Sequence, residues 1–168
     1  MCKFFSGVIE RNKTVHYLPG VNCHTTILES VGLSDHTDSP GAMQFARFEI
    51  TQGSAVFDDF SKWILEIDER IRPEWWSPAH EVAARTVFKR YMTEQLSMGC
   101  FPGDLDLRGY THPLPPGLTS VGGDLYLEGY THPLPQGLTS VGGYLYLRGY
   151  THPLPQGLRS LAPVNTPR

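Results

Sequence analysis

The sequence predicts an α+β domain at residues 1–99, followed by a short β-solenoid at residues 103–162 and a tail at residues 163–168. Three observations support this prediction. One 20-residue unit is written three times without insertion between residues 103 and 162, which is typical of stacked repeats that bury their apolar faces against one another. Alternating apolar residues near the N-terminus indicate strands, and the segment before Gly99 carries the start and stop signals of a long helix.

Composition limits the class of protein. With 168 residues, of which 40% are hydrophobic, the chain has the size of one globular domain or two small ones. Acidic residues outnumber basic ones by 13 to 10 over residues 1–102 and by 4 to 3 over the repeats, so neither part is a basic surface for nucleic acid. No stretch approaches the ~18 apolar residues of a membrane span. We expect neither nucleic acid nor a membrane as a partner.

The cysteines and the N-terminus indicate the compartment. Cys2, Cys23 and Cys100 are an odd number of cysteines without CxxC spacing. The chain does not open with a charged segment followed by an apolar one, as a secretory leader would. These features predict a reduced, cytoplasmic protein.

Four elements are expected in the first 70 residues. Residues 2–11 alternate apolar side chains and are expected to pair in a hairpin with residues 14–18. Asn22 is placed to cap a helix at residues 23–31, which Gly32 ends. Two further strands are expected at residues 44–51 and 63–68.

The clearest single element is a helix at residues 78–98. Ser77 is a favoured N-cap residue, Pro78 suits the first helical position, and Gly99 suits the position just past the end. Its apolar side recurs at steps of three and four residues, at Ala84, Val87, Phe88, Tyr91 and Gln95. Such a helix is expected to pack on the sheet of the first domain.

Each repeat opens with two leucines two positions apart, such as Leu105 and Leu107, so both point inward from one short strand. A proline- and leucine-rich return follows, as in Leu134-Pro135-Gln136-Gly137-Leu138. The combination resembles the leucine-rich repeats, in particular the short bacterial 20-residue class. The resemblance covers about 60 residues and implies a solenoid of leucine-rich-repeat type. Gly-Tyr-Thr-His stands where that class has an asparagine after the strand.

The period predicts columns of identical side chains with a spacing of about 4.8 Å between neighbouring strands. One column is Tyr110, Tyr130 and Tyr150, and another is His112, His132 and His152. We interpret these residues as a binding stripe. The alternative is that the copies share them only because the unit was duplicated; a histidine metal site is weaker still, because one column offers one edge of an ion. A second outward column, Asp106, Tyr126 and Tyr146, is the next candidate surface.

Cys2 is the candidate catalytic residue. Removal of Met1 would leave its thiol beside its own α-amino group, which can act as a base. This arrangement looks like the start of class II glutamine amidotransferases, although Lys3 stands here in place of their glycine. The structural alternative, a small buried residue that opens a strand, is the interpretation we favour.

The opening Met1-Cys2-Lys3-Phe4-Phe5-Ser6, with His24-Thr25 at the start of a helix, resembles an uncharacterised family of bacteriophage and prophage proteins. Members combine a compact N-terminal domain with a variable repetitive array. The resemblance covers about the first 70 residues and implies a phage accessory protein made in the cytoplasm of an infected bacterium. No catalytic residue is carried over from it.

We therefore favour a non-enzymatic interaction protein that binds a host protein to counter host defence. Two alternatives stay open. One is an N-terminal-cysteine hydrolase or transferase. The other is sequestration of a nucleotide immune signal in a pocket of the first domain, for which the ligand residues would be Arg47, Arg70, Arg72 and Trp75. We expect no metal ion and no cofactor, and a homo-oligomer formed through the C-terminal end of the repeats.

Overall fold

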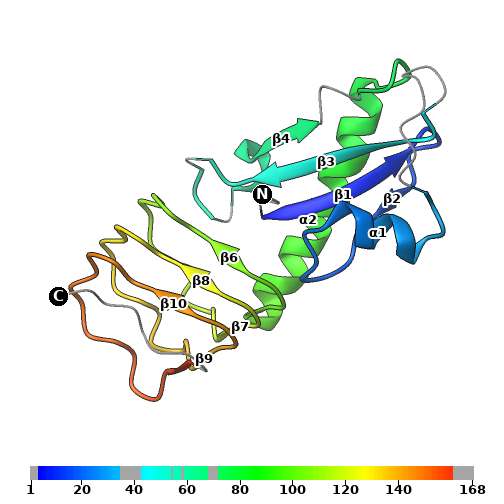
Figure 1. Cartoon of the computed structure of the whole chain (residues 1–168). Coiled ribbons are helices and arrows are strands. Elements are labelled where there is room, and N and C mark those ends of the chain that lie inside the picture. The colour runs from blue at the N-terminus through cyan, green and yellow to red at the C-terminus, as the bar shows by residue number, and fades with distance from the viewer. Residues whose placement is uncertain (1–3, 35–42, 54, 58, 68–71, 161–168) are drawn as a thin grey trace. The chain divides into compact units, whose positions relative to one another are not determined.

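The computed structural model describes residues 4–34, 43–53, 55–57, 59–67 and 72–160 (Figure 1). It divides the chain into two compact parts. The N-terminal body comprises Met1–Gly53 and Trp63–Tyr91, and the repeat body comprises Ser54–Lys62 and Met92–Arg168. The expected boundary near Gly99 differs from this division, because Ser54–Lys62 and the end of the long helix belong with the repeats.

The N-terminal body contains one antiparallel sheet of four strands, in the order β2-β1-β3-β4. The strands are β1 (Phe5–Glu10), β2 (Val15–His16), β3 (Phe45–Thr51) and β4 (Ile64–Ile67). The hairpin and the two later strands expected from the sequence are confirmed. Lys13 turns the hairpin with a positive φ of 74°.

Two helices accompany this sheet among the described residues. The short α1 (His24–Ser30) begins after Cys23, one residue later than the expected cap, and buries Ile27 and Leu28 in a cluster with Val8 of β1. The long α2 (Pro78–Met98) has the bounds that the sequence predicts. Its buried side includes Ala84, Phe88 and Tyr91, and Phe88 contacts Phe5 of β1 edge to face, with ring centroids 5.3 Å apart.

The repeat body contains two parallel sheets built from strands of two residues. The first has the order β10-β8-β6 and the second the order β11-β9-β7-β5. The bounds are β5 (Cys100–Phe101), β6 (Leu105–Asp106), β7 (Ser120–Val121), β8 (Leu125–Tyr126), β9 (Ser140–Val141), β10 (Leu145–Tyr146) and β11 (Arg159–Ser160). A 3-10 turn at Phe60–Lys62 also belongs to this body. Paired residues such as Leu105 and Leu125 are 20 positions apart, as the sequence period requires.

The predicted fold class, an α+β domain followed by a β-solenoid of leucine-rich-repeat type, is wrong. Over the residues that the structure describes, the chain is mixed: two α-helices accompany short strands, some in an antiparallel sheet and some in parallel sheets. The proline-rich return of each repeat ends in a second strand, such as β7, and the sheet formed by these second strands starts at β5, before the first repeat. The spacing of the leucines correctly indicates the buried face but not the second strand.

Buried leucines and valines fill the interior of the repeats. Leu105, Leu125 and Leu145 are all inaccessible to solvent, and so are Leu127, Leu138 and Leu147. The backbones of successive repeats approach closely at paired glycines: a Cβ added to Gly142 would collide with the carbonyl oxygen of Gly122, and one added to Gly122 with that of Pro102. The absence of side chains at these positions therefore sets the distance between repeats.

We predict that Gly142→Ala lowers the free energy of unfolding by about 1–3 kcal/mol, because the new methyl group has to displace backbone. The matched control is Gly137→Ala, where the nearest atom to an added Cβ is 3.8 Å away. That control should be neutral or stabilise the protein by up to about 1 kcal/mol, since alanine restricts the unfolded chain. Urea denaturation of both variants measures the difference, and equal stabilities would contradict the close approach.

Candidate protein-binding face of the repeats

The tyrosine column of the proposed binding stripe lies inside the repeat body. Tyr110 and Tyr130 are only 4% and 1% exposed, and Tyr150 is half-buried. The rings stack along the repeats, with centroids 6.3 Å apart between Tyr110 and Tyr130 and 6.5 Å apart between Tyr130 and Tyr150. Tyr110 and Tyr130 therefore offer almost no surface to a partner. Gly109, Gly129 and Gly149 precede them with positive φ, which turns the chain so that the rings point inward.

Each of these tyrosine hydroxyls accepts a hydrogen bond from the backbone of the preceding segment. The Leu114 N–H donates to Tyr130 Oη at 2.8 Å, and the Leu134 N–H donates to Tyr150 Oη at 2.9 Å. The Phe57 N–H makes the same bond to Tyr110 Oη at 3.0 Å. A buried N–H without a partner costs free energy, so the hydroxyls have a structural task.

The histidine column also links successive repeats. The Nε2–H of His132 donates to the Thr111 carbonyl at 2.8 Å, and that of His152 donates to the Thr131 carbonyl at 2.7 Å. The rings are half-buried, and each packs on the tyrosine two positions before it. His132 and His152 are thus partly accessible, but the Nε2 atom of each ring is already engaged in a hydrogen bond.

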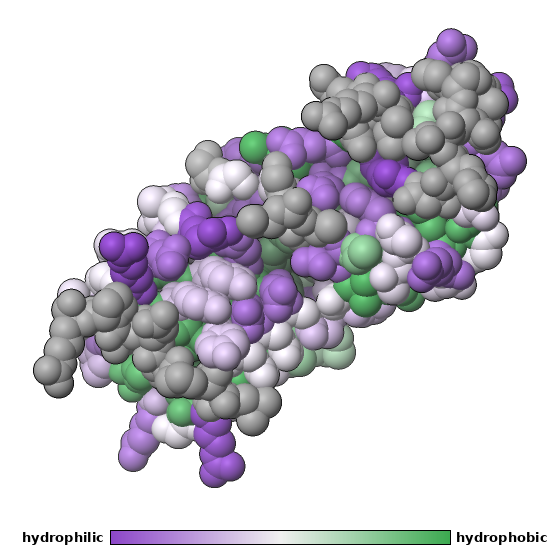
Figure 2. All heavy atoms as spheres, viewed as in Figure 1, coloured by the Kyte–Doolittle hydropathy of each residue, from purple (hydrophilic) through white to green (hydrophobic). Residues whose placement is uncertain are grey.

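The second candidate column carries the aromatic surface. Tyr126 of β8 and Tyr146 of β10 are half-buried and stack face to face, with centroids 4.5 Å apart and planes inclined by 4°. Tyr144, which is 48% exposed, adjoins Tyr146 with centroids 5.8 Å apart. Figure 2 shows side chains of intermediate hydropathy gathered over this sheet, with strongly hydrophilic ones around them. The sheet β6-β8-β10 therefore presents a preformed aromatic surface.

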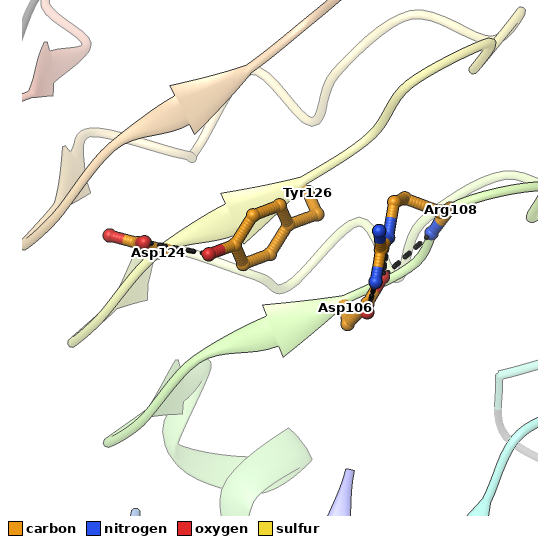
Figure 3. A network of polar contacts seen from close by, with 4 residues as sticks. All are labelled: Asp106, Arg108, Asp124 and Tyr126. Carbon is orange, nitrogen blue, oxygen red and sulfur yellow. Dashed lines mark hydrogen bonds and ion pairs between the residues drawn. The ribbon is translucent and has the colours of Figure 1, made fainter. Parts of the chain in front are cut away.

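An acidic side chain fixes the orientation of the first ring. Tyr126 Oη donates to Asp124 Oδ2 at 2.9 Å (Figure 3). This bond to a carboxylate, together with partial desolvation, raises the pKa of Tyr126 to about 12. The other oxygen, Asp124 Oδ1, accepts the Tyr144 N–H at 2.7 Å, so one carboxylate holds two successive repeats together.

The Tyr126 ring stacks on Tyr146 and also lies next to an ion pair between Arg108 and Asp106. Arg108 donates to both carboxylate oxygens of Asp106, with Nη2 2.6 Å from Oδ2 (Figure 3). This bond from Arg108 lowers the pKa of Asp106 below its usual value. The guanidinium carbon lies 5.5 Å from the centroid of Tyr126, within the range of a cation–π contact. Such exposed pairs add little stability, and their main effect is to fix the side chains in place.

We call this surface the tyrosine face; it consists of Asp106, Arg108, Asp124, Tyr126, Tyr144 and Tyr146. It holds no cysteine or serine paired with a base, so it lacks the parts of an activated nucleophile. In the part of the chain that the structure describes, no three histidine, cysteine, aspartate or glutamate side chains are grouped as metal ligands. Ordered aromatic rings with charged neighbours are instead typical of a surface that binds another protein.

The structure shows no contact that joins the remaining predicted site residues among those it describes. Cys2 and Arg70 lie outside the described residues. Arg47 is half-buried on β3, and Arg72 is exposed. The indole of Trp75 donates to the Met43 carbonyl at 2.7 Å and packs on His80, which is a structural role.

Sequence reasoning missed three members of the tyrosine face, namely Arg108, Asp124 and Tyr144. Asp124 and Tyr144 occupy the same position in successive repeats, two residues before Tyr126 and Tyr146. The exchange of aspartate for tyrosine at this position is visible in the sequence. Variation between otherwise identical copies was the available signal. The identical tyrosine column is largely internal, and the variable positions carry the surface chemistry.

We predict that Tyr130→Phe lowers the free energy of unfolding by about 1–3 kcal/mol, because the buried Leu114 N–H loses its acceptor. Tyr144→Phe is the control, since its ring is largely exposed, and it should change stability by less than about 0.5 kcal/mol. Thermal and urea unfolding provide the measurement. A Tyr130→Phe protein as stable as the control would show that the hydroxyl is dispensable.

Alkaline titration tests the Asp124 contact. Burial raises the pKa of Tyr130 to about 12, so two tyrosines are expected to ionise late in the parent protein. Asp124→Asn removes the negative charge beside Tyr126, and the tyrosinate absorbance of one residue should then appear closer to pH ~10, while Tyr130 stays unchanged.

The raised pKa values of Tyr126 and Tyr130 also make the stability of the folded protein depend on pH. Because both pKa values are raised on folding, their stabilisation is complete below pH ~10 and is lost as the pH rises toward about 12. The Asp124→Asn protein should lose less stability over this interval than the parent. Identical titration curves for the two proteins would contradict the contact.

None of the described helices combines the length with the apolar composition needed to cross a membrane. Comparisons of the chain with protein families, with curated proteins and with solved structures give no match.

Proposed function

We propose that this chain is an interaction protein that binds a partner protein through the tyrosine face. The observation that carries the proposal is the stacked pair of half-buried rings, Tyr126 and Tyr146, on the sheet β6-β8-β10. Tyrosine is enriched at protein interfaces because it offers a large apolar area and a polar tip at low conformational cost.

The rings are ordered before any partner arrives. Asp124 holds the Tyr126 hydroxyl, the Arg108–Asp106 pair lies on one side of its ring, and Tyr146 lies on the other. Side chains that are already fixed lose little entropy on binding, so more of the contact energy contributes to affinity. The charged groups around the rings can then select partners by charge complementarity.

The partner that we propose is a protein of a bacterial host, bound to counter host defence. This part of the proposal rests on the resemblance of the first 70 residues to phage and prophage proteins. The tyrosine face supports protein binding in general, and it suits a task that requires recognition without chemistry.

The experiment is affinity capture from bacterial lysate, followed by mass spectrometry and by measurement of the affinity for the captured protein. We expect Tyr126→Ala combined with Tyr146→Ala to weaken binding by more than about 1 kcal/mol, the usual threshold for an important interface residue. Thr111→Ala combined with Thr131→Ala is the matched control, because both side chains are exposed and lie outside the tyrosine face.

Unfolding curves of both double variants separate binding from stability. Loss of the two half-buried rings should cost about 1–3 kcal/mol of stability, because both the stacking and the buried apolar area are lost. If the tyrosine variant stays folded and binds the captured protein as tightly as the control does, the tyrosine face is not the binding surface.

A further inference from the structure

Charge changes along the three repeats. The first repeat carries Asp104, Asp106 and Arg108, and the second carries Asp124 and Glu128. The third carries only Arg148 and Arg159, so formal charge runs from −1 through −2 to +2. Among the described residues neither arginine of the third repeat forms an ion pair. The end of the array is therefore basic although the chain as a whole is acidic.

The same end has an apolar side chain that its equivalents bury. Leu114 and Leu134 are 5% and 2% exposed, whereas Leu154 is 42% exposed. The backbone N–H of each earlier leucine donates to the tyrosine hydroxyl of the following repeat. Within the described residues no hydroxyl accepts the Leu154 N–H.

The sheet edge at this end has hydrogen-bond donors in the positions that a further strand would use. Leu105 N–H donates to Asp124 O and Leu125 N–H donates to Tyr144 O, each at 2.8 Å. Every first strand thus donates forward to the next repeat. The equivalent donor is the Leu145 N–H on β10, which is the last strand of its sheet among the described residues.

The opposite end of the repeats is covered from within the repeat body. Phe57 contacts Phe101 and Tyr110 edge to face, with centroids 5.5 and 6.4 Å away, and its N–H occupies Tyr110 Oη. The Tyr110 hydroxyl, which would have to accept the Leu154 N–H of a second copy, is therefore already occupied. Two copies placed third repeat to third repeat would bring four arginines together, which like-charge repulsion disfavours.

The charges of the first two repeats indicate which charge an added strand should place next to Arg148 at the edge of β10. Glu128 stands one repeat after Arg108 in the register that pairs β6 with β8. The pKa of Arg108 is raised mainly by its bond to Asp106, and the charge of Glu128 adds to this effect. Arg148 is the residue equivalent to Arg108 in the third repeat. An acidic side chain at the same register in an added strand would therefore lie one strand from Arg148, as Glu128 lies one strand from Arg108.

We propose that β10 of the third repeat binds an extended acidic segment of the partner protein, which adds as a parallel strand. The apolar–aromatic–apolar alternation of this segment would place one ring on Tyr146, and a carboxylate at the register of Glu128 would lie beside Arg148. Arg159, on β11 of the other sheet, adds to the positive charge at this end of the repeats. Strand addition to a sheet edge is an established mode of peptide recognition. The inference rests on the proposed function, because it names the partner segment that this protein-binding surface takes.

The test uses the full chain and a synthetic peptide with the sequence GDLYLEGY, which is that of residues 123–130 and matches the strand that the first repeat already binds. Nuclear magnetic resonance titration should show shifts of the amides of β10 and Leu154, with a dissociation constant of about 1 mM, as suits one short strand. Added salt should weaken binding, because exposed charges are screened. The control peptide GKLYLKGY should bind at least about tenfold more weakly, equivalent to ~1.4 kcal/mol.

Charge reversal in the protein gives a matched second test. Arg148→Glu combined with Arg159→Glu changes two exposed side chains, so the fold should be retained. This variant should lose affinity for GDLYLEGY and gain affinity for GKLYLKGY. An exchange of preference cannot arise from unfolding.

Three outcomes would overturn the inference. Equal binding of the two peptides would remove the charge argument. A dimer in sedimentation that binds neither peptide would assign the edge to a second copy. Peptide binding only after deletion of residues 163–168 would assign the edge to the chain's own tail. None of them affects capture of a partner by the tyrosine face. Loss of capture in the Tyr126 and Tyr146 variant tests the proposed function separately.

Discussion

The bond between a buried backbone N–H and a tyrosine hydroxyl of the next repeat is the constraint on which the repeat body depends. It recurs at Phe57, Leu114 and Leu134, each time at 2.8–3.0 Å. Proline-rich returns cannot form long regular ladders, since proline lacks an N–H, and so the few donors that they retain need side-chain acceptors. Because its hydroxyl accepts this bond, each ring of the column that contains Tyr110 and Tyr130 lies in the interior. Tyr126 and Tyr146, in the neighbouring column, then form the surface.

Local signals were sufficient to predict the N-terminal body. The start of α2 follows from Ser77 and Pro78, and its end from Gly99, whose φ of 65° suits glycine. The strands β1, β3 and β4 follow from the alternation of apolar residues. These elements are encoded by neighbouring residues, and that is why one sequence reveals them. The inclusion of Ser54–Lys62 in the repeat body depends on contacts far apart in the chain, such as Phe57 with Tyr110, which no local pattern contains.

The repeats show the opposite case. Their period correctly gave the 20-residue register but not the fold class, because a period specifies which residues are equivalent and leaves open how the chain runs between them. Nor does a period tell which column is internal. Tyr130 and Tyr126 are both aromatic and only four residues apart, yet one is 1% exposed and the other is half-buried. Tyr130 is the one whose hydroxyl accepts a buried backbone N–H, that of Leu114. This need for an acceptor is seen only in the folded structure, not in the sequence.

The glycine contacts between repeats also affect how such a protein can evolve. Gly122 lies against Pro102, and Gly142 lies against Gly122, so the junction after the first repeat closely matches the junction after the second. Recombination that gains or loses a whole 20-residue block between these junctions joins surfaces that already fit. A change of any other length would place side chains against backbone and shift every later tyrosine away from its donor. The genetic unit of variation in this part of the chain is therefore the complete repeat, with the Phe57 end and the Arg148 end kept as fixed boundaries.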